Sequence, residues 1–424
     1  MRAQRRAGTE RMAQGIFVAG AKKDAGKTTL SLGLIHHLRS RIDGGVSFTK
    51  PLGQKTTIVD DTAAGQDSWF VDKALDLNLD LEYTAPFSAS SGAATEYIVT
   101  GEPGDILRRI KRAYRHLGRK SGLVVVEGTG HPGVGSVFNL SNASVAKVLD
   151  LPVILVLDGG IGRTIDMFSL CRSLFEQQQV RILGVVVNRV IPSKMDKISS
   201  ILGKWFEKAG VRIFGMIPFE RRISTPSLGV ISRTLDASPM LSMSSIGIHR
   251  VSGYLTAFGS SDEVVRNVRE SPESALLVSA NRRDVLDSLF SRKLAGEVPE
   301  GPGALILCGS EGNRYTYIHS ACEKLSIPLY RTEGTVAGSA YRLESRVFKV
   351  EPDEREKIEA IIDLVGTHVD IDAILHELAV PPAEPRKKAT GLQRFLGRSV
   401  RFFEKLFGPG EDDTETEDTA EEER

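Results

Sequence analysis

Residues 16–29 read Ile16-Phe17-Val18-Ala19-Gly20-Ala21-Lys22-Lys23-Asp24-Ala25-Gly26-Lys27-Thr28-Thr29. An apolar run leads into a turn rich in glycine and lysine, and residues with helical spacing follow. This order of strand, turn and helix is the setting of a phosphate-binding loop, in which backbone N–H groups and a helix N-terminus hold anionic oxygens. We therefore expect this turn to bind a nucleotide.

The loop supplies most of the candidate nucleotide-binding residues. Lys27 is placed to reach the β- and γ-phosphates, and Thr28 to offer its hydroxyl to Mg²⁺. The usual spacing, G-x-x-x-x-G-K-[ST], would put its first glycine where Ala21 stands, so an ordinary glycine–lysine turn before a surface helix is the alternative. Lys22 stands where dimeric NTPases with variant loops carry a second lysine, which indicates a homodimer. The other candidates of the turn are Gly20, Asp24, Ala25, Gly26 and Thr29.

Composition places the chain among ordinary globular proteins of two or three domains, with 424 residues, of which 41% are hydrophobic and 26% charged. The net charge of +1 gives no overall field that attracts nucleic acid, so we expect no nucleic-acid partner. Three widely spaced cysteines, Cys171, Cys308 and Cys322, suit a reducing compartment. No apolar run is long enough to cross a membrane, so we expect a cytoplasmic protein, soluble or peripheral at the membrane.

Short β-branched runs alternate with helical stretches from residue 16 to about residue 225. Because these runs are continuously apolar rather than alternating, they are typical of strands buried on both faces of a parallel sheet. We predict an α/β fold in which residues 15–227 form a parallel-sheet P-loop NTPase domain, after a flexible N-terminus of residues 1–14. The strand-like runs after the first are 46–49, 123–126, 153–157, 185–187 and 213–217.

A second, smaller α/β domain is expected over residues 270–380. Its strand-like runs are 275–278, 304–307 and 327–330, and its helical stretches are 283–295, 314–324 and 353–366. Residues 228–246 are rich in Ser and Met without clear periodicity, so we interpret 228–269 as a connecting segment.

The C-terminal part of the chain combines a basic amphipathic helix, residues 381–408, with an acidic disordered tail, residues 409–424. Between residues 391 and 407, leucines and phenylalanines recur at near-helical spacing with arginines and a lysine interleaved. This apolar face either packs on the protein's own body or binds a membrane surface or a protein partner.

Three further candidates follow strands, at the edge where open α/β sheets bind their ligands. Glu127 comes after 123–126 and before Gly128, and its carboxylate can bind Mg²⁺. Lys50 comes after 46–49 and can neutralise charge on a transferred phosphoryl group or a carboxylate substrate, which makes it a catalytic candidate beside Lys27. Asn188 comes after 185–187, and its amide can pair with an adenine edge. The alternatives are a capping carboxylate, a solvated lysine and a turn-forming asparagine.

Two more sets of polar residues lie near the expected phosphates. A second acidic Mg²⁺ ligand could come from Asp60, Asp61 or Asp67, and spacing alone does not choose among them. His131 begins a glycine-bearing loop beyond Glu127, where a surface hydrogen-bonding role is favoured over that of a general base.

Taken in order, these motifs resemble the dethiobiotin synthetase-like P-loop family over residues 16–225. They are Gly20-x5-Gly26-Lys27-Thr28, Thr49-Lys50-Pro51, Val126-Glu127-Gly128-Thr129-Gly130, Leu151-Pro152-Val153-Ile154-Leu155-Val156 and Val187-Asn188. The five-residue spacing between Gly20 and Gly26 is usual in that family. Residues 270–375 resemble the regulatory domain named for its Asp-Arg-Thr-Gly-Gly signature (DRTGG), with 279–284 at the signature's place. The same pair of domains forms the N-terminal part of long bacterial phosphotransacetylases.

The resemblance implies binding of ATP with Mg²⁺ in a homodimer. It implies that Lys27 and Thr28 contact the phosphates and the metal, that Asn188 contacts the base, and that Lys50 lies near the reacting group. It also implies that the metal ligands are Thr28, Glu127 and Asp67, the last of which matches the family better than Asp60 or Asp61.

Two functions are compatible with these features. In the first, favoured, interpretation the protein is an enzyme that hydrolyses ATP or activates a small carboxylate or carbamate by phosphoryl transfer. In the second it is a non-catalytic nucleotide sensor that acts through its DRTGG-like domain and C-terminal helix. The sequence does not name an acceptor substrate.

Overall fold

The computed structural model of the chain describes residues 14–53, 56–59, 62–89, 92–100, 105–241, 251–298, 300–309 and 315–379. Asp60 and Asp61, the first thirteen residues of the N-terminus, the expected amphipathic helix and the acidic tail lie outside the described residues.

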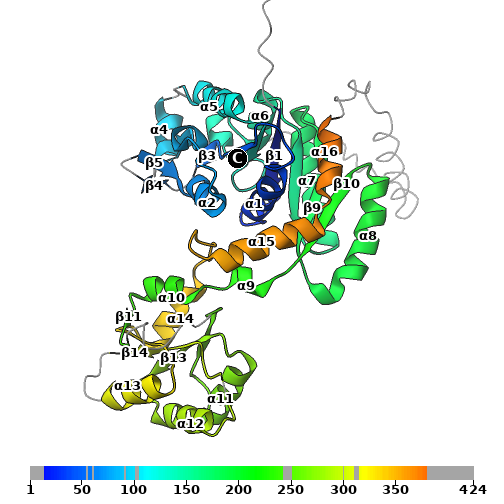
Figure 1. Cartoon of the computed structure of the whole chain (residues 1–424). Coiled ribbons are helices and arrows are strands. Elements are labelled where there is room, and N and C mark those ends of the chain that lie inside the picture. The colour runs from blue at the N-terminus through cyan, green and yellow to red at the C-terminus, as the bar shows by residue number, and fades with distance from the viewer. Residues whose placement is uncertain are drawn as a thin grey trace, which may run out of the picture. The chain divides into compact units, whose positions relative to one another are not determined.

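The first sheet consists of six parallel strands in the order β10-β9-β8-β1-β7-β2 (Figure 1). The predicted parallel α/β fold is therefore confirmed. The central strand β1 pairs with β7 on one side and β8 on the other, so Phe17 lies opposite both Val126 and Val153. The strands are β1 (Gln14–Gly20), β2 (Val46–Thr49), β7 (Leu123–Glu127), β8 (Val153–Asp158), β9 (Ile182–Val190) and β10 (Arg212–Pro218).

Both faces of this sheet are buried, because successive residues of β1 enter different cores. Phe17 and Ala19 belong to one apolar cluster, and Ile16 and Val18 to the other. A strand whose two faces are both covered requires the continuous apolar runs seen in the sequence. The helices of the first cluster are α5 (Ile106–Lys120), α6 (Asn142–Val148), α7 (Gly162–Gln177) and α8 (Met195–Lys208).

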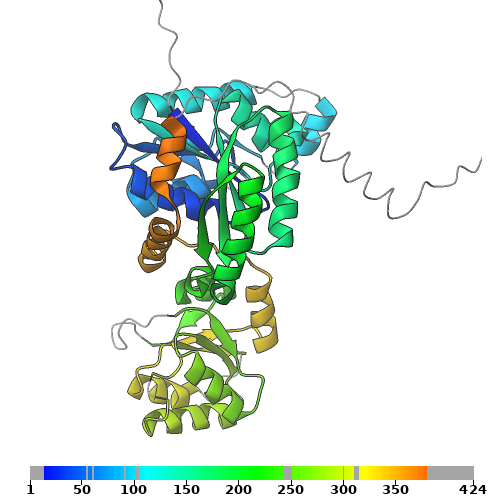
Figure 2. The same ribbon diagram turned by 90° about the vertical axis from the view of Figure 1, so that its right-hand side faces the viewer.

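The second core is closed by helices from both ends of the chain. It contains α1 (Lys27–Leu38), α2 (Gln66–Leu75) and two helices from the segment expected in the second domain, α15 (Arg355–His368) and α16 (Ile371–Ala379). Figure 2 shows α15 and α16, in orange, beside the strands of the first sheet. The contact between α1 and α15 is close, because a Cβ added at Gly33 would lie 2.3 Å from Cβ of Val365.

Short elements between β2 and β7 frame the edge of the first sheet. Two small sheets pair β3 (Leu52–Gly53) with β6 (Phe87–Ser88) and β4 (Thr56–Val59) with β5 (Thr62–Gly65). The helices α3 (Leu81–Thr84) and α4 (Ala93–Thr100) also belong to this region. The 3₁₀ turns 136–138 and 192–194 come later in the chain, after β7 and β9. The short helix α9 (Arg221–Ser224) follows β10.

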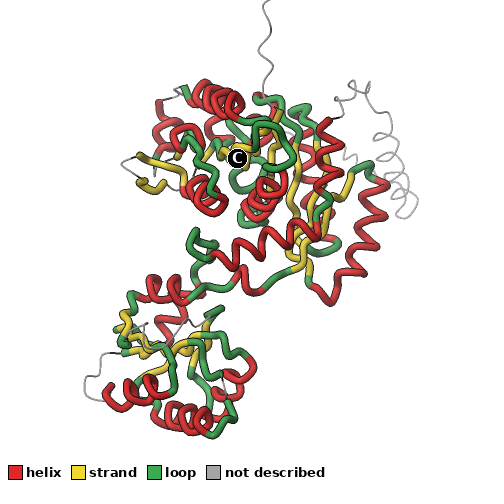
Figure 3. The backbone as a smooth tube through the Cα atoms, viewed as in Figure 1, coloured by secondary structure: helices red, strands yellow, loops and turns green. Residues whose placement is uncertain are grey.

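A second sheet of five strands follows, in the order β11-β15-β14-β13-β12, in which only β11 is antiparallel to its neighbour (Figure 3). The strands are β11 (Ser238–Pro239), β12 (Tyr254–Thr256), β13 (Ala275–Ser279), β14 (Ala304–Cys308) and β15 (Leu329–Thr332). The helices are α10 (Leu228–Leu235), α11 (Ser261–Glu270), α12 (Arg283–Leu294), α13 (Tyr315–Lys324) and α14 (Val336–Glu344). Three of these elements, α10, β11 and β12, and all but the last residue of α11 lie in the segment 228–269 that we interpreted as a connection.

Candidate functional site

The loop between β1 and α1 has the conformation of a phosphate-binding turn. Asp24 and Gly26 have φ angles of +59° and +98°, and Gly26 is the N-cap of α1. A Cβ at Gly26 would lie 1.9 Å from Nδ2 of Asn188, so both the backbone angle and the close neighbour require glycine there. Thr29 lies in the first turn of α1. The backbone therefore turns sharply enough to bring the N-terminus of α1 against the carboxyl edge of the sheet.

Lys27 folds back over this loop. A Cβ at Gly20 would lie 3.0 Å from Cγ of Lys27, so the glycine leaves room for the lysine stem. Its Nζ donates to the carbonyl oxygens of Gly130, at 3.0 Å, and Lys22, at 3.4 Å. Burial lowers the pKa of Lys27 to about 8, although Glu127 opposes the shift. The ammonium is thus held by neutral carbonyls, and an anion at the loop would satisfy it better.

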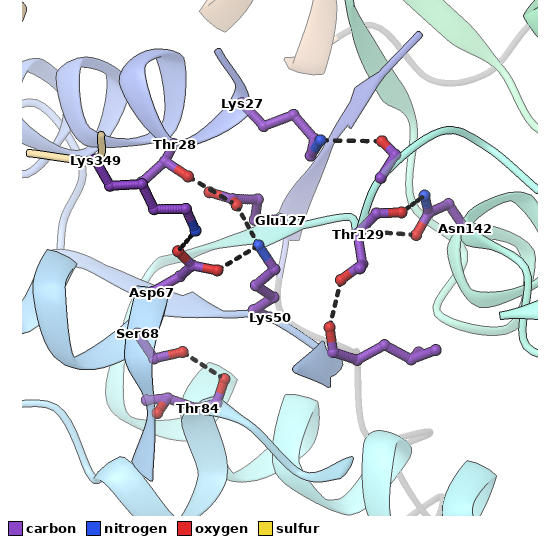
Figure 4. Close-up of polar contacts among 12 residues, drawn as sticks. Lys27, Thr28, Lys50, Asp67, Ser68, Thr84, Glu127, Thr129, Asn142 and Lys349 are labelled. Carbon is purple, nitrogen blue, oxygen red and sulfur yellow. Dashed lines mark hydrogen bonds and ion pairs between the residues drawn. The ribbon is translucent and has the colours of Figure 1, made fainter. Parts of the chain in front are cut away.

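Four side chains form a continuous chain of charge-assisted contacts next to this loop (Figure 4). The hydroxyl of Thr28 donates to Oε1 of Glu127 at 3.0 Å, and the same oxygen accepts from Nζ of Lys50 at 2.8 Å. Lys50 also donates to Oδ2 of Asp67 at 2.7 Å. The structure therefore brings residues from α1, β7, the end of β2 and α2 to one point.

The charges in this chain stabilise one another. Burial alone would lower the pKa of Lys50, but the carboxylates of Glu127 and Asp67 outweigh it and raise that pKa. Burial opposes ionisation of Asp67 in the same way, but Lys50 and Lys349 outweigh it and lower the pKa of Asp67 to about 2. The ammonium of Lys50 and the carboxylate of Asp67 are therefore charged at neutral pH.

The position of Glu127 is fixed by the loop that follows it. The side chain of Asn142 accepts from N–H of Thr129 at 3.0 Å and donates to the carbonyls of Thr129 and His131, both at 2.8 Å. The hydroxyl of Thr129 donates to the carbonyl of Leu52. Asn142 was not predicted from the sequence, because its only role is to hold backbone groups eleven to thirteen residues away. It positions the carboxylate without contacting it.

Lys50 is positioned in a comparable way at the end of β2. Its N–H donates to the carbonyl of Thr84 at 2.8 Å, and the hydroxyls of Thr49 and Ser68 donate to that same oxygen at 3.1 and 3.0 Å. One carbonyl thus ties the strand end to the first turn of α2, which carries Asp67.

Asn188 lies behind the loop rather than beside it. Its Nδ2 donates to the carbonyl of Ala25 at 2.9 Å, and its Oδ1 accepts from N–H of Arg189 at 2.9 Å. The side chain is buried, with 5% of the residue exposed. In this arrangement the amide supports the phosphate-binding turn, and its role at a base stays a prediction.

Lys22 pairs with Asp158, which ends β8. The other carboxylate oxygen, Oδ1 of Asp158, is buried without a hydrogen-bond partner among the residues that the structure describes. Both residues line a small cavity of about 50 Å³ with Arg163 and Thr164 of α7. Asp158 was missed by the sequence analysis, although it follows an apolar strand as Glu127 does. His131, by contrast, is exposed, and its Nδ1 accepts from N–H of Gly133 at 3.2 Å.

The donor atoms suit a hard divalent cation. Oε2 of Glu127 is buried and has no hydrogen-bond partner within the described part of the chain, although Oε1 has two. Carboxylates of Glu127 and Asp67 and the hydroxyl of Thr28 are oxygen donors of the kind that Mg²⁺ prefers. No group of three His, Cys, Asp or Glu side chains that could hold a metal occurs among the described residues. A magnesium ion here would need phosphate oxygens and water to complete its shell, as is usual for nucleotide sites.

A parallel sheet, a glycine-rich turn with Lys27 and Thr28, and carboxylates at a neighbouring strand end define a P-loop NTPase. Residues 14–227 match the family model AAA_26, described as an AAA domain, which covers half of the chain. The chain belongs to this family.

Curated relatives agree with the motif order seen in the sequence. The chain is 30% identical to an ATP-dependent dethiobiotin synthetase, BioD, of Clostridium kluyveri over 186 residues, which cover 42% of this chain and 75% of that protein. It is 26% identical to a phosphate acetyltransferase of Haemophilus influenzae over 410 residues, 88% of this chain and 54% of that protein. The chain thus spans about half the length of the acetyltransferase. The resemblance to dethiobiotin synthetases and long phosphotransacetylases is confirmed.

Among solved structures, the chain is similar to the MinD cell division protein of Aquifex aeolicus, with 14% identity and a TM-score of 0.30 over 50% of this chain and 84% of that one. Within the described residues, no helix is both apolar and long enough to cross a bilayer.

Proposed function

We propose that the chain binds ATP with Mg²⁺ and either hydrolyses it or transfers its γ-phosphoryl group to a carboxylate or carbamate. The observation that carries this proposal is the contact chain Thr28–Glu127–Lys50–Asp67 beside Lys27 at the mouth of the loop. These are the groups that phosphoryl transfer needs: a cation for the phosphates, ligands for a metal and a second cation near the reacting oxygen.

Each group has a distinct part in this proposal. Lys27 exchanges its two carbonyl contacts for phosphate oxygens, which lie where the loop N–H groups converge. Thr28, Glu127 and Asp67 would hold Mg²⁺, which would neutralise charge on the β- and γ-phosphates. Lys50, which lies between the two carboxylates, would supply a positive charge near the transferred group, where negative charge develops.

Relatives favour the transfer reaction over simple hydrolysis. The printed name of the Clostridium kluyveri relative describes an ATP-dependent synthetase.

A turnover assay tests the proposal. We expect purified full-length protein to release phosphate from ATP in the presence of Mg²⁺, alone or with candidate short-chain acids and amines under bicarbonate. Lys27→Ala should lose nucleotide binding, and Lys50→Arg should keep binding but lose turnover, because a planar guanidinium does not reproduce the compact charge of the ammonium near the transferred group. Lys204→Ala, which changes an exposed lysine of α8, is the matched control.

A second candidate function is that of a nucleotide sensor, favoured by one observation. Lys349, which follows α14, donates to Oδ1 of Asp67 at 2.7 Å and so connects the candidate metal site to the segment after the second sheet. Binding of ATP with Mg²⁺ but without phosphate release, under every acceptor tried, would favour the sensor over the enzyme. A homodimer, a cytoplasmic location, the DRTGG-like nature of the second domain and a partner for residues 391–407 stay predictions.

A further inference from the structure

The chain passes from one apolar core to the other within three residues. Phe348 packs against the cluster that contains Leu277 and Ile306 of the second sheet. Val350 packs against the cluster that contains Val71 of α2 and Leu34 of α1. Lys349 lies between them, so this residue marks the changeover between the two cores, in the segment that joins α14 to α15.

This segment and Arg355, the first residue of α15, are attached to opposite ends of α2, the helix that carries Asp67 in its first turn. At the start of α2, Lys349 binds Asp67 through a 2.7 Å ion pair. At its end, Arg355 donates to the carbonyl of Ala74 at 3.2 Å and lies 4.0 Å from a carboxylate oxygen of Asp76. The chain from Lys349 to Arg355 therefore runs along α2. A displacement of Asp67 would act directly on Lys349, the residue at which the chain passes from one core to the other.

Asp67 has two lysine partners, one for each oxygen. Lys50 holds Oδ2 and Lys349 holds Oδ1, so each oxygen already has a cationic partner with which a metal ion would compete (Figure 4). Lys50 is nearly buried, with 10% of its side chain exposed, whereas 54% of the Lys349 side chain is exposed. Because the more exposed ammonium regains solvation when it leaves, the Lys349 contact is the cheaper one to break.

We propose that Lys349 is a positioning residue that competes with Mg²⁺ for Asp67 and thereby couples occupancy of the nucleotide site to the segment between the two sheets. This inference rests on the proposed binding of Mg²⁺ with a nucleotide. If Asp67 held Mg²⁺, Lys349 would lose its partner and the 345–354 segment would lose one of its attachments to α2. Linkage makes the coupling reciprocal, so a change in the second domain that withdraws Lys349 also strengthens binding of the metal.

The size of the effect follows from the exposure of the lysine. A partly exposed ion pair contributes a free energy equivalent to a factor of about two to five in an equilibrium constant. Lys349→Gln should therefore lower the Mg²⁺ concentration needed for half-maximal nucleotide binding by about two- to fivefold. Lys349→Arg keeps the charge and should behave like the wild type.

The test measures binding rather than turnover. A fluorescent ATP analogue is titrated with Mg²⁺ on full-length wild type, Lys349→Gln, Lys349→Arg and the matched control Arg346→Gln, which removes an exposed positive charge from the same segment. Hydrogen exchange of residues 345–354 is followed in parallel. We expect exchange to rise on addition of Mg²⁺ and nucleotide in the wild type, and to be already high without them in Lys349→Gln.

The outcomes separate this inference from the proposed function. If the wild type binds nucleotide with Mg²⁺ but Lys349→Gln shows the same Mg²⁺ dependence, the inference is overturned and the proposed function stands. An equal effect of Arg346→Gln would likewise overturn it, since the cause would then be general charge rather than contact with Asp67. If the wild type binds no nucleotide, both are overturned.

Discussion

Replacing Lys50 by alanine tests the electrostatic arrangement of the site. The variant leaves Glu127, which is fully buried, with one hydroxyl donor, and leaves Asp67 with Lys349 alone. Loss of one partner from a buried ion pair costs about 3–5 kcal/mol. Because Asp67 keeps one lysine, we expect the free energy of unfolding to fall by the lower end of that range, about 3 kcal/mol. For a domain of this size the melting temperature should fall by about 6–12 °C.

The assay is thermal unfolding of the full chain at neutral pH, with Lys204→Ala as the control for loss of an exposed lysine. Two further measurements identify the cause. Adding Glu127→Gln to Lys50→Ala should recover much of the lost stability, since it removes the charge left unpaired. Mg²⁺ should stabilise Lys50→Ala more than the wild type, because the metal can replace the ammonium. A fall of less than about 2 °C, or no recovery in the double variant, would refute the reasoning.

Three other changes test separate parts of the structure. The pKa of Lys27 is lowered from 10.5 to about 8, so between these two pH values the unfolded chain binds more protons than the folded chain. The free energy of unfolding of the wild type should therefore rise relative to that of Lys27→Met from about pH 8 to 10.5, and the two curves should stay parallel below pH 8. Curves that are parallel at every pH would contradict the burial of the ammonium. The pKa of Asp67 is lowered from 3.8 to about 2, so in urea unfolding the wild type should be more stable than Asp67→Asn by a full margin above about pH 4, and this margin should vanish towards pH 2. A margin that does not change with pH would show that the two lysines do not stabilise the Asp67 carboxylate. Gly33→Ala should lower the free energy of unfolding by about 1–3 kcal/mol, because its Cβ would overlap Val365. Gly203→Ala has nothing within 4 Å of its Cβ and should raise the free energy of unfolding by up to about 1 kcal/mol in the same urea titration. Equal effects of the two substitutions would rule out the close packing of α15 on α1.

Several features of the fold were predictable because they are local. The apolar run at 46–49 is β2, and the run at 123–126 is β7 without its last residue, Glu127. The helical spacing at 353–366 predicts α15, found at 355–368. The spacing could not show which sheet α15 covers, since an apolar face looks the same whichever core receives it. The helix α10 was missed although Leu228, Ile231 and Leu235 recur at helical spacing and are buried, because its eight residues were read together with the Ser- and Met-rich residues from Ser238 onward.

In the candidate site, too, residues with a local sequence signal were predictable and residues that depend on distant packing were not. Glu127 and Lys50 were found because strand ends meet at one edge of a parallel sheet, and Asp67 because its spacing from Lys50 matches the family. Asp158 obeys the same strand-end rule, so its signal was present in the sequence but not used. Lys349 had no such signal, since its contact with Asp67 joins residues 282 positions apart and depends on the packing of the segment before α15.

Calorimetric titration of the full-length chain with ATP, with and without Mg²⁺, measures the central claim most directly. The account predicts one nucleotide bound per chain, weaker binding without Mg²⁺, loss of binding in Lys27→Ala and unchanged binding in Lys204→Ala. Binding that survives Lys27→Ala unchanged, or no binding by the wild type, would contradict the claim that the loop between β1 and α1 holds a triphosphate.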